Sequence, residues 1–254
     1  MGRTAAFSLF ELAVVLTIIG LLTGGIVAGQ SLLRSAALRD ISTTIQKFNG
    51  AVDLFREEFR GLPGDLRNAT DYWGAADSTP STCVTTPSPT KATCNGNGDR
   101  RIEVSTGSHE MFRFWQHLAN AGLIEGKFDG IAHGSTTDAA TEANSPRGRL
   151  TSSLWYTEYV GSLSSDSDRF DGMYTNVLVY GASRDDAPPI NGLLSPKEIW
   201  SLDSKIDDGK PGLGSLVVRS WPLCTTASNS SNLTASYKLT EATPLCSLIL
   251  RQIW

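Results

Sequence analysis

The sequence lacks the spacings of the common catalytic motifs. No GxSxG, HExxH, CxxC, GxxxxGKS or GxxxxGKT occurs in its 254 residues. The usual scaffolds for a nucleophile, a catalytic zinc ion, a redox dithiol and a bound phosphate are therefore missing. His109 and His117 are eight residues apart, which is not a ligand spacing on a helix, and His133 stands alone. We expect a protein that is not an enzyme.

An excess of positive charge is also missing. The chain has 22 Lys and Arg against 26 Asp and Glu, which gives a formal net charge of −4 and an isoelectric point near 5.4. This balance offers no electrostatic basis for binding a polyanion. Nucleic acid is therefore not an expected partner.

One stretch near the N-terminus has no charge at all. From Leu12 to Ala28 there is no charged residue, and only Thr and Gly interrupt the apolar run. With its apolar flanks, a helix of this length can cross a bilayer. Glu11 comes just before this run, where a carboxylate is costly in hydrocarbon and usually marks a function or a partner. A secretory signal peptide or a plain membrane anchor has no need of such an acid.

The segment AFSLFELAVVLTIIGLL, from Ala6 to Leu22, resembles the cleavage and methylation segment of type IV prepilins and type II secretion pseudopilins. The resemblance implies a leader peptide at residues 1–6 and cleavage by a prepilin peptidase between Ala6 and Phe7. It implies N-methylation of the new terminal Phe7, and a role in assembly for Glu11. Ala6 stands where this family nearly always has Gly.

The function implied by this resemblance is structural. The chain would be an enlarged pilin-like subunit of a type IV pilus, that is a fimbrium, or of the pseudopilus of a type II secretion system. Its partners would be other pilin or pseudopilin subunits, the prepilin peptidase, the inner-membrane assembly platform and membrane lipid. The subunit would cross the bacterial inner membrane once and then join a periplasmic or extracellular filament.

The apolar pattern continues beyond the uncharged stretch as the face of an amphipathic helix. Steps of three and four separate the apolar residues Ile41, Ile45, Phe48, Val52, Phe55 and Phe59. Gly61 and Pro63 then supply a stop. We predict one long helix over residues 7–60. Its first half would be transmembrane, and its second half would pack on an extracytoplasmic head at residues 61–254.

The head combines strand-like and helical segments. Residues 154–160, 173–182, 214–221 and 247–254 are rich in β-branched and aromatic side chains and are predicted to form strands. Ser195, Pro196 and Glu198 have the spacing of a capping box that begins a helix. Strands that are separate from one long helix predict an α+β fold with an antiparallel sheet, a pilin-like arrangement.

The head contains all four cysteines, Cys83, Cys94, Cys224 and Cys246. Four cysteines allow three pairings, and the sequence-local one joins Cys83 to Cys94 and Cys224 to Cys246. An oxidising, extracytoplasmic location would favour disulfides. Neither pair has the CxxC spacing of a zinc site.

The segment NGNGDRRIE has oxygen donors at alternate positions, Asn95, Asn97 and Asp99, followed by Glu103. This pattern is similar to the start of a calcium loop, in which alternating side chains converge on one cation. Arg100 replaces the usual Gly, and no acid follows at the twelfth position. An Asn/Gly turn next to a disulfide explains the same residues, so both interpretations stay open.

A second candidate for a cation site is Asp203 with Asp207 and Asp208. The alternative is helix-end and turn chemistry at the Asp-Asp-Gly sequence. Calcium is the one cofactor that these two patterns suggest, and no cofactor is required by the filament hypothesis.

These candidate sites support a second hypothesis of another class, a membrane-anchored extracytoplasmic binding module that depends on calcium. Such a module needs the hydrophobic span but not Glu11. The mature N-terminus distinguishes the two hypotheses. A methylated Phe7 favours the filament subunit, and an intact Met1 favours the binding module.

Overall fold

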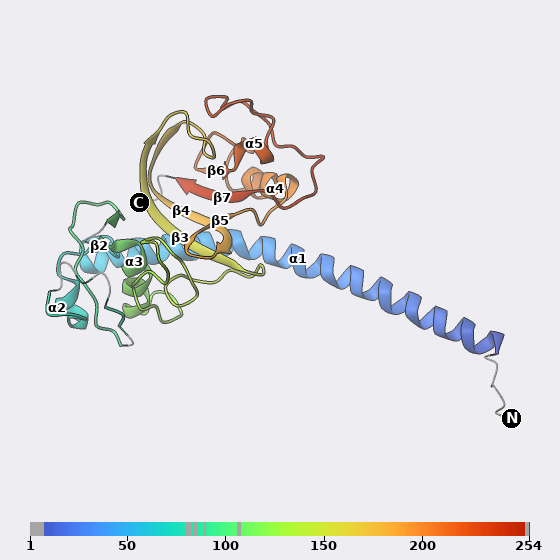
Figure 1. Ribbon diagram of the computed structural model, residues 1–254, viewed down its shortest axis with the longest axis horizontal. Helices are drawn as coiled ribbons and strands as arrows, with labels where there is room; N and C mark the ends of the chain where they lie inside the picture. The colour runs from blue at the N-terminus through green and yellow to red at the C-terminus, as the bar shows by residue number, and fades with distance from the viewer. Residues whose placement is uncertain (1–7, 80–82, 84–85, 89, 106–107, 252–253) are drawn as a thin grey trace. The chain divides into compact units, whose positions relative to one another are not determined.

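The computed structural model describes residues 8–79, 83, 86–88, 90–105, 108–251 and 254. The chain divides into two compact units, Met1–Asp40 and Ile41–Trp254. Helix α1, Leu9–Phe59, contributes residues to both (Figure 1). The predicted cleavage residues Ala6 and Phe7 lie outside the described residues.

The first unit consists of the N-terminal part of α1, whose apolar side chains are exposed. Leu9 is 87% exposed and Phe10 is 77% exposed. An 18-residue window of α1 has a mean hydropathy of 2.3, and none of it is buried. Within the described part of the chain, α1 is the one helix long and apolar enough to cross a membrane. This is consistent with a single-pass anchor.

The second unit begins inside α1, where the helix becomes amphipathic. Its inward side chains are at most 5% exposed and include Ile41, Ile45, Phe48, Val52 and Phe55. The Phe48 ring centroid lies 5.0 Å from the ring centroid of Trp115 on helix α3 (Glu110–Asn120). It lies 5.5 Å from the ring centroid of Trp155 on strand β3 (Ser153–Leu163). The apolar spacing therefore predicted the packed face of the helix correctly.

A five-stranded antiparallel sheet forms the other part of the head core (Figure 1). Its strands are β3 (Ser153–Leu163), β4 (Gly172–Arg184), β5 (Ala187–Asn191), β6 (Leu216–Arg219) and β7 (Ser247–Arg251). The order is β3-β4-β7-β6, and β5 also pairs with β4. Val177, Leu178 and Val179 of β4 are fully buried, so both faces of this strand are covered. The predicted α+β class with an antiparallel sheet is confirmed.

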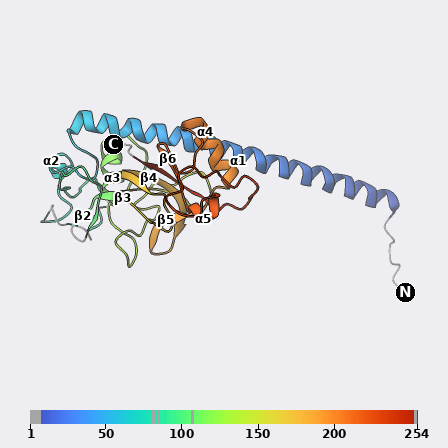
Figure 2. The same cartoon turned by 90° about the horizontal axis from the view of Figure 1, so that it is seen from above.

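The remaining elements are short. They are α2 (Ala69–Trp73), the two-residue strands β1 (Val104–Ser105) and β2 (Ser108–His109), α4 (Pro196–Ile206) and α5 (Trp221–Cys224). Figure 2 shows α4 and α5 with the strands of the C-terminal half of the chain. Helix α4 begins with the predicted capping box, in which the Ser195 N–H donates to the Glu198 carboxylate at 2.8 Å and the Glu198 N–H donates to the Ser195 Oγ at 3.4 Å.

Within the five-stranded sheet, two strands differ from the sequence-based prediction, and residues 252–253 of the strand expected over residues 247–254 lie outside the described residues. The strand expected over residues 214–221 ends at Arg219, because Trp221 and Pro222 open α5 instead. Strand β5 was not predicted, since it contains Pro188 and Pro189. It pairs with β4 alone, at an edge position where a missing N–H costs no central ladder bond.

Candidate functional site

The first turn of α1 contains a reciprocal pair of hydrogen bonds between Ser8 and Glu11. The Ser8 N–H donates to the Glu11 carboxylate at 2.8 Å, and the Glu11 N–H donates to the Ser8 Oγ at 3.2 Å. This is the geometry of a capping box. It satisfies backbone donors at the helix start and turns the Glu11 carboxylate back toward the N-terminal end. The sequence had marked Glu11 for its charge and not for this local bond.

The surroundings of Glu11 are apolar and open. Leu9, Phe10 and Leu12 are 87%, 77% and 56% exposed. In the membrane such side chains contact lipid or another helix, whereas a carboxylate among them needs a compensating partner. The geometry therefore presents one acid within a large apolar surface.

Both sequence-local disulfides are present in the head. The Cα atoms of Cys83 and Cys94 are 5.9 Å apart, and those of Cys224 and Cys246 are 5.6 Å apart. All four residues are buried. Each bridge closes a loop that is rich in Ser and Thr, so we expect it to restrict the unfolded chain.

Replacing Cys224 and Cys246 together by Ala is expected to lower the free energy of unfolding by about 3 kcal/mol, because the unfolded loop regains its freedom. Urea unfolding with and without reductant measures the change. The paired replacement of Cys83 and Cys94 should cost slightly less, since its loop is shorter. Free thiols, or a bridge between Cys94 and Cys224, in a non-reducing peptide map would contradict the pairing.

The side chains of the predicted calcium loop each have a partner within the protein. The Asn95 Oδ1 accepts from the Thr70 N–H at 3.0 Å, and the Asn97 Oδ1 accepts from the Asp99 N–H at 2.8 Å. The Asp99 Oδ1 accepts from the Arg101 N–H at 2.9 Å, and the Glu103 carboxylate lies 3.9 Å from the Arg101 guanidinium. Calcium binding by Asn95, Asn97, Asp99 and Glu103 stays a prediction.

Two buried acids that are not part of the predicted calcium site accept hydrogen bonds from the backbone of the loop at residues 95–103. The Asp65 carboxylate accepts from the backbone N–H groups of Gly98, Asp99 and Arg100. The Glu110 carboxylate accepts from the N–H groups of Asn97 and Glu103, at 3.0 and 3.1 Å. Asp65 is 3% exposed and Glu110 is 1% exposed. Burial raises the pKa of Asp65, and its hydrogen bonds to the backbone oppose that rise.

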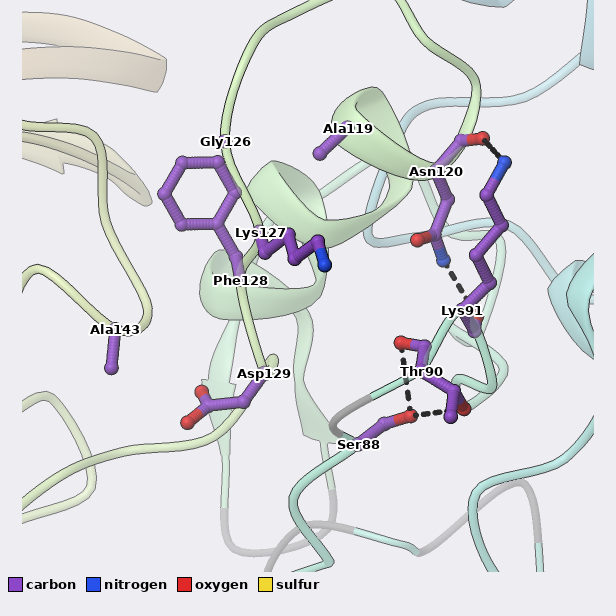
Figure 3. Close-up of a pocket in the computed structure, with 10 residues that line it drawn as sticks. All are labelled: Ser88, Thr90, Lys91, Ala119, Asn120, Gly126, Lys127, Phe128, Asp129 and Ala143. Atoms are coloured by element: carbon purple, nitrogen blue, oxygen red, sulfur yellow. Dashed lines mark hydrogen bonds between the residues drawn. The ribbon is translucent and has the colours of Figure 1, made fainter.

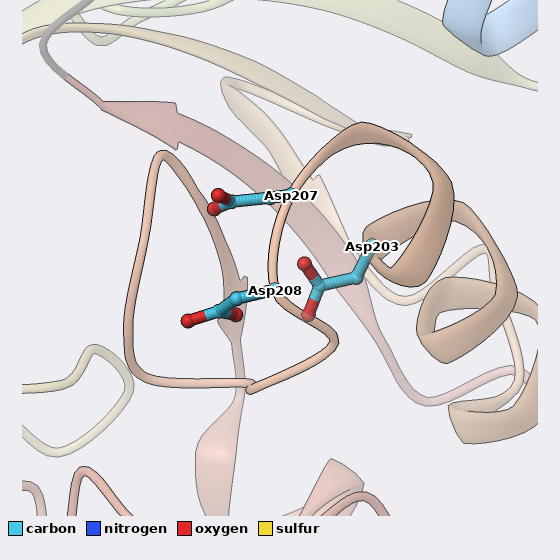
Figure 4. Close-up of side chains that lie close together, drawn as sticks. All are labelled: Asp203, Asp207 and Asp208. Carbon is cyan, nitrogen blue, oxygen red and sulfur yellow. The ribbon is translucent and has the colours of Figure 1, made fainter.

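Asp203, Asp207 and Asp208 come together at the end of α4 (Figure 4). One carboxylate oxygen from each lies within 4.8 Å of the others. Asp203 is fully buried, and its Oδ2 accepts from the Tyr237 hydroxyl at 2.8 Å, while its Oδ1 has no hydrogen-bond partner among the described residues. The Asp207 Oδ2 accepts from the Leu216 N–H at 3.1 Å and so holds the start of β6. Hard oxygen donors of this kind suit a divalent cation such as calcium.

The charge at this cluster needs compensation. The C-terminal end of a helix carries partial negative charge, which disfavours further carboxylates there. The pKa of Asp203 is raised from 3.8 to about 7, mainly by burial and also by the charges of Asp208 and Asp207, against the lowering effect of the Tyr237 bond. Either a proton or a cation can therefore neutralise Asp203 near neutral pH.

In a chelating buffer, the free energy of unfolding should fall by about 2 kcal/mol as the pH rises from 4 to 7. Asp203 binds its proton more tightly in the folded protein than in the unfolded chain, so stability is lost as that proton leaves. Urea unfolding across this range measures the effect, and saturating calcium chloride should remove it. The Asp203→Asn variant should lack this dependence, whereas the exposed control Asp185→Asn should keep it. Parallel pH profiles for wild type and Asp203→Asn would contradict the prediction.

Helix α3 buries polar side chains that its sequence pattern assigned to no site. The residues concerned are Glu110, Arg113, Gln116 and His117, all at most 3% exposed. The Gly64 N–H donates to the His117 Nδ1 at 2.9 Å, and the His117 Nε2 lies 2.9 Å from the Thr93 hydroxyl. Burial, together with the nearby Arg113 charge, lowers the pKa of His117 to about 3, so this imidazole is neutral.

Arg113 extends the same network into the disulfide loop. Its guanidinium donates to the carbonyl oxygens of Cys83, Thr86 and Asp129 at 3.0–3.2 Å and to the Gln116 Oε1 at 2.9 Å. Burial lowers the pKa of Arg113 to about 10, which leaves it charged at neutral pH. The network fixes Cys83 and Thr86 against α3. The network could not be predicted from the sequence, because the carbonyl groups that accept hydrogen bonds from Arg113 are distant from it in the sequence.

In the comparisons, no protein-family description, curated protein or solved structure matches the chain. The function is therefore argued from the geometry of α1 and of the head.

Proposed function

We propose that this chain is a subunit of a filament of the type IV pilus or type II secretion pseudopilus kind. The observation that carries the proposal is the first half of α1, an exposed apolar helix with a single carboxylate, Glu11, in its first turn. A hydrophobic span alone would anchor the chain without that acid. The sequence around it, from Ala6 to Leu22, resembles the processing segment of prepilins.

The second half of α1 supports the same proposal. A subunit whose helix is withdrawn from lipid into a filament needs a head that stays folded throughout. Ile41, Phe48 and Phe55 pack into the head core and are at most 5% exposed. The proposed filament would use residues 7–40 as the contact between copies and the folded head as its outer surface.

Under this proposal, a prepilin peptidase cuts between Ala6 and Phe7 and methylates the new amine. The chain then waits as a single-pass protein in the bacterial inner membrane, and an assembly platform adds it to other subunits. The proposal includes no catalytic role for the chain. It leaves the choice between a pilus and a secretion pseudopilus open.

Mass spectrometry of the mature chain tests this proposal. The protein is expressed with a prepilin peptidase, and the expected product begins at a methylated Phe7. The Ala6→Gly variant should be processed at least as fast, because Gly is the residue usual in the family. An intact Met1 in both forms would count against the filament subunit.

A second candidate function is a membrane-anchored extracytoplasmic binding module that depends on calcium. The acidic cluster of Asp203, Asp207 and Asp208 favours it, since the buried Asp203 has an oxygen without a hydrogen-bond partner. Calcium titration of the full chain in detergent, with Asp203→Asn as the comparison, tests it. Heat of binding in wild type alone would support a calcium site, whereas equal traces would oppose it.

A further inference from the structure

A cavity of about 540 Å³ opens on the head beside the disulfide loop (Figure 3). Its walls come from Ser88, Thr90 and Lys91, from the end of α3 at Ala119 and Asn120, from residues 126–129, and from Ala143. Sites for small molecules in proteins commonly have about 300–1,000 Å³ of space. The cavity is thus large enough for a small organic ligand.

Hydrogen bonds hold the walls in place. The Lys91 ammonium donates to the Asn120 carbonyl oxygen at 2.9 Å, and the Asn120 amide donates back to the Lys91 carbonyl oxygen at 2.7 Å. The Ser88 N–H donates to the Asp129 carbonyl oxygen at 3.3 Å and so joins two of the walls. A site built in advance loses less free energy when it binds a ligand.

Three charged residues line this cavity, the two lysines Lys91 and Lys127 and the acid Asp129. Among the residues that the structure describes, neither Lys91 nor Lys127 forms an ion pair with a carboxylate. The Asp129 carboxylate is engaged by His133, whose Nε2 lies 2.5 Å from its Oδ2, and Figure 3 shows this carboxylate on the side of Ala143, away from Lys91. Two ammonium groups thus remain for a ligand, on a protein whose net charge is −4. An anionic group in the cavity would be attracted by both ammonium groups.

The other lining groups suit a polyhydroxylated ring. Ser88 and Thr90 supply hydroxyl groups, and Asn120 supplies an amide oxygen that its bond to Lys91 does not use. Ala119, Phe128 and Ala143 add apolar surface against which the C–H groups of a ring can lie. Hydroxyls, an amide and two ammonium groups together match a sugar that carries one negative charge.

We propose that this cavity binds an anionic sugar, a hexose-sized ring with one carboxylate or phosphate group, whose charge lies at the Lys127 ammonium, while the Lys91 ammonium adds a second positive charge to the lining. The ring hydroxyls bond Asn120, Ser88 and Thr90. This binding does not depend on filament formation, so the two proposals can fail separately. The site gives the head a ligand in addition to its part in assembly.

Calorimetric titration of the full chain in detergent micelles tests the proposal. The probes are galacturonate and glucose 6-phosphate, with galactose and glucose as their uncharged counterparts. We expect millimolar binding of at least one anionic sugar and at least about tenfold weaker binding of its neutral counterpart, since a hydrogen bond to a charged group is among the stronger ones. No heat from either anionic sugar at 50 mM, taken as roughly saturating for a millimolar site, would overturn the proposal.

Matched lysine variants and salt provide the controls. Lys127→Gln should weaken binding of the anionic sugar about tenfold, whereas Lys197→Gln, an exposed lysine on α4, should leave it unchanged. Raising sodium chloride should weaken binding in wild type through charge screening, which needs no variant at all. Equal binding by Lys127→Gln and wild type, or equal binding of charged and neutral sugars, would show that the anion does not lie at this lysine.

Discussion

Replacing Glu11 by Gln is expected to reduce incorporation of the chain into a filament about tenfold or more, while the chain stays folded, membrane-inserted and cleaved. Gln can still accept the Ser8 N–H, so the helix start keeps its capping bond and only the charge is lost. The expected loss therefore isolates the charge of Glu11 from its size and from its local structural role.

The physical reason is the cost of a carboxylate among exposed apolar side chains. That cost is about 3 kcal/mol for an acid deep in the bilayer, and an opposite charge can offset it. Cleavage before Phe7 would create a free α-amine on Phe7, the residue next to Ser8. Addition of a single methyl group leaves this amine cationic. Between copies, the amine of one subunit and the Glu11 of its neighbour would fix the axial register, since a buried charge pair contributes more reliably to specificity than to stability.

Two further variants make this expectation sharp. Ser8→Ala removes the capping hydroxyl but keeps the charge, so it should cost about 1 kcal/mol of helix stability and leave assembly near normal. Glu11→Ala removes the charge together with the carboxylate acceptor of the Ser8 N–H, and it should assemble no better than Glu11→Gln. Incorporation is measured in a sheared filament fraction beside wild-type partner subunits. If Glu11→Gln assembles at wild-type levels, the charge pairing is wrong and the membrane-anchored module gains support.

Replacing Asp65 by Ala should destabilise the head by about 4 kcal/mol, because three backbone N–H groups lose their acceptor at once. The loop cannot easily rearrange to give these N–H groups another acceptor. A Cβ placed on Gly96 would lie 2.3 Å from the Asp65 Cα, so the two segments already touch through their backbones.

Urea unfolding of the full chain in detergent, followed by tryptophan fluorescence, measures this change. The control is Asp99→Ala, which removes an exposed carboxylate from the same loop and should cost about 1 kcal/mol, since it caps a single N–H group. Both measurements are repeated with calcium and with chelator. An Asp65→Ala variant as stable as Asp99→Ala, or a loop that loses its order in chelator alone, would assign the support of this loop to a cation.

The elements that could be predicted from the sequence are those whose patterns lie within a few neighbouring residues. The uncharged run from Leu12 to Ala28 and the apolar steps from Ile41 to Phe59 specify one helix with two environments, because burial on a helix follows a fixed period. The same holds for the capping box at Ser195, which needs only residues three apart. The antiparallel sheet followed from runs of β-branched and aromatic residues, although β5 was hidden by its prolines.

Which polar residues are buried, and therefore where the candidate sites lie, depends on the tertiary fold and could not be predicted from the sequence. Arg113, Gln116 and His117 are buried on α3, where His117 accepts a hydrogen bond from Gly64, 53 residues away. Asp65 likewise meets N–H groups 33 to 35 residues further along the chain. A polar side chain can be buried only if a distant group satisfies it, and hydrophobic periodicity carries no record of that partner. The sequence marked Asp203 by its spacing to Asp207, but the fold supplied its burial and its bond to Tyr237.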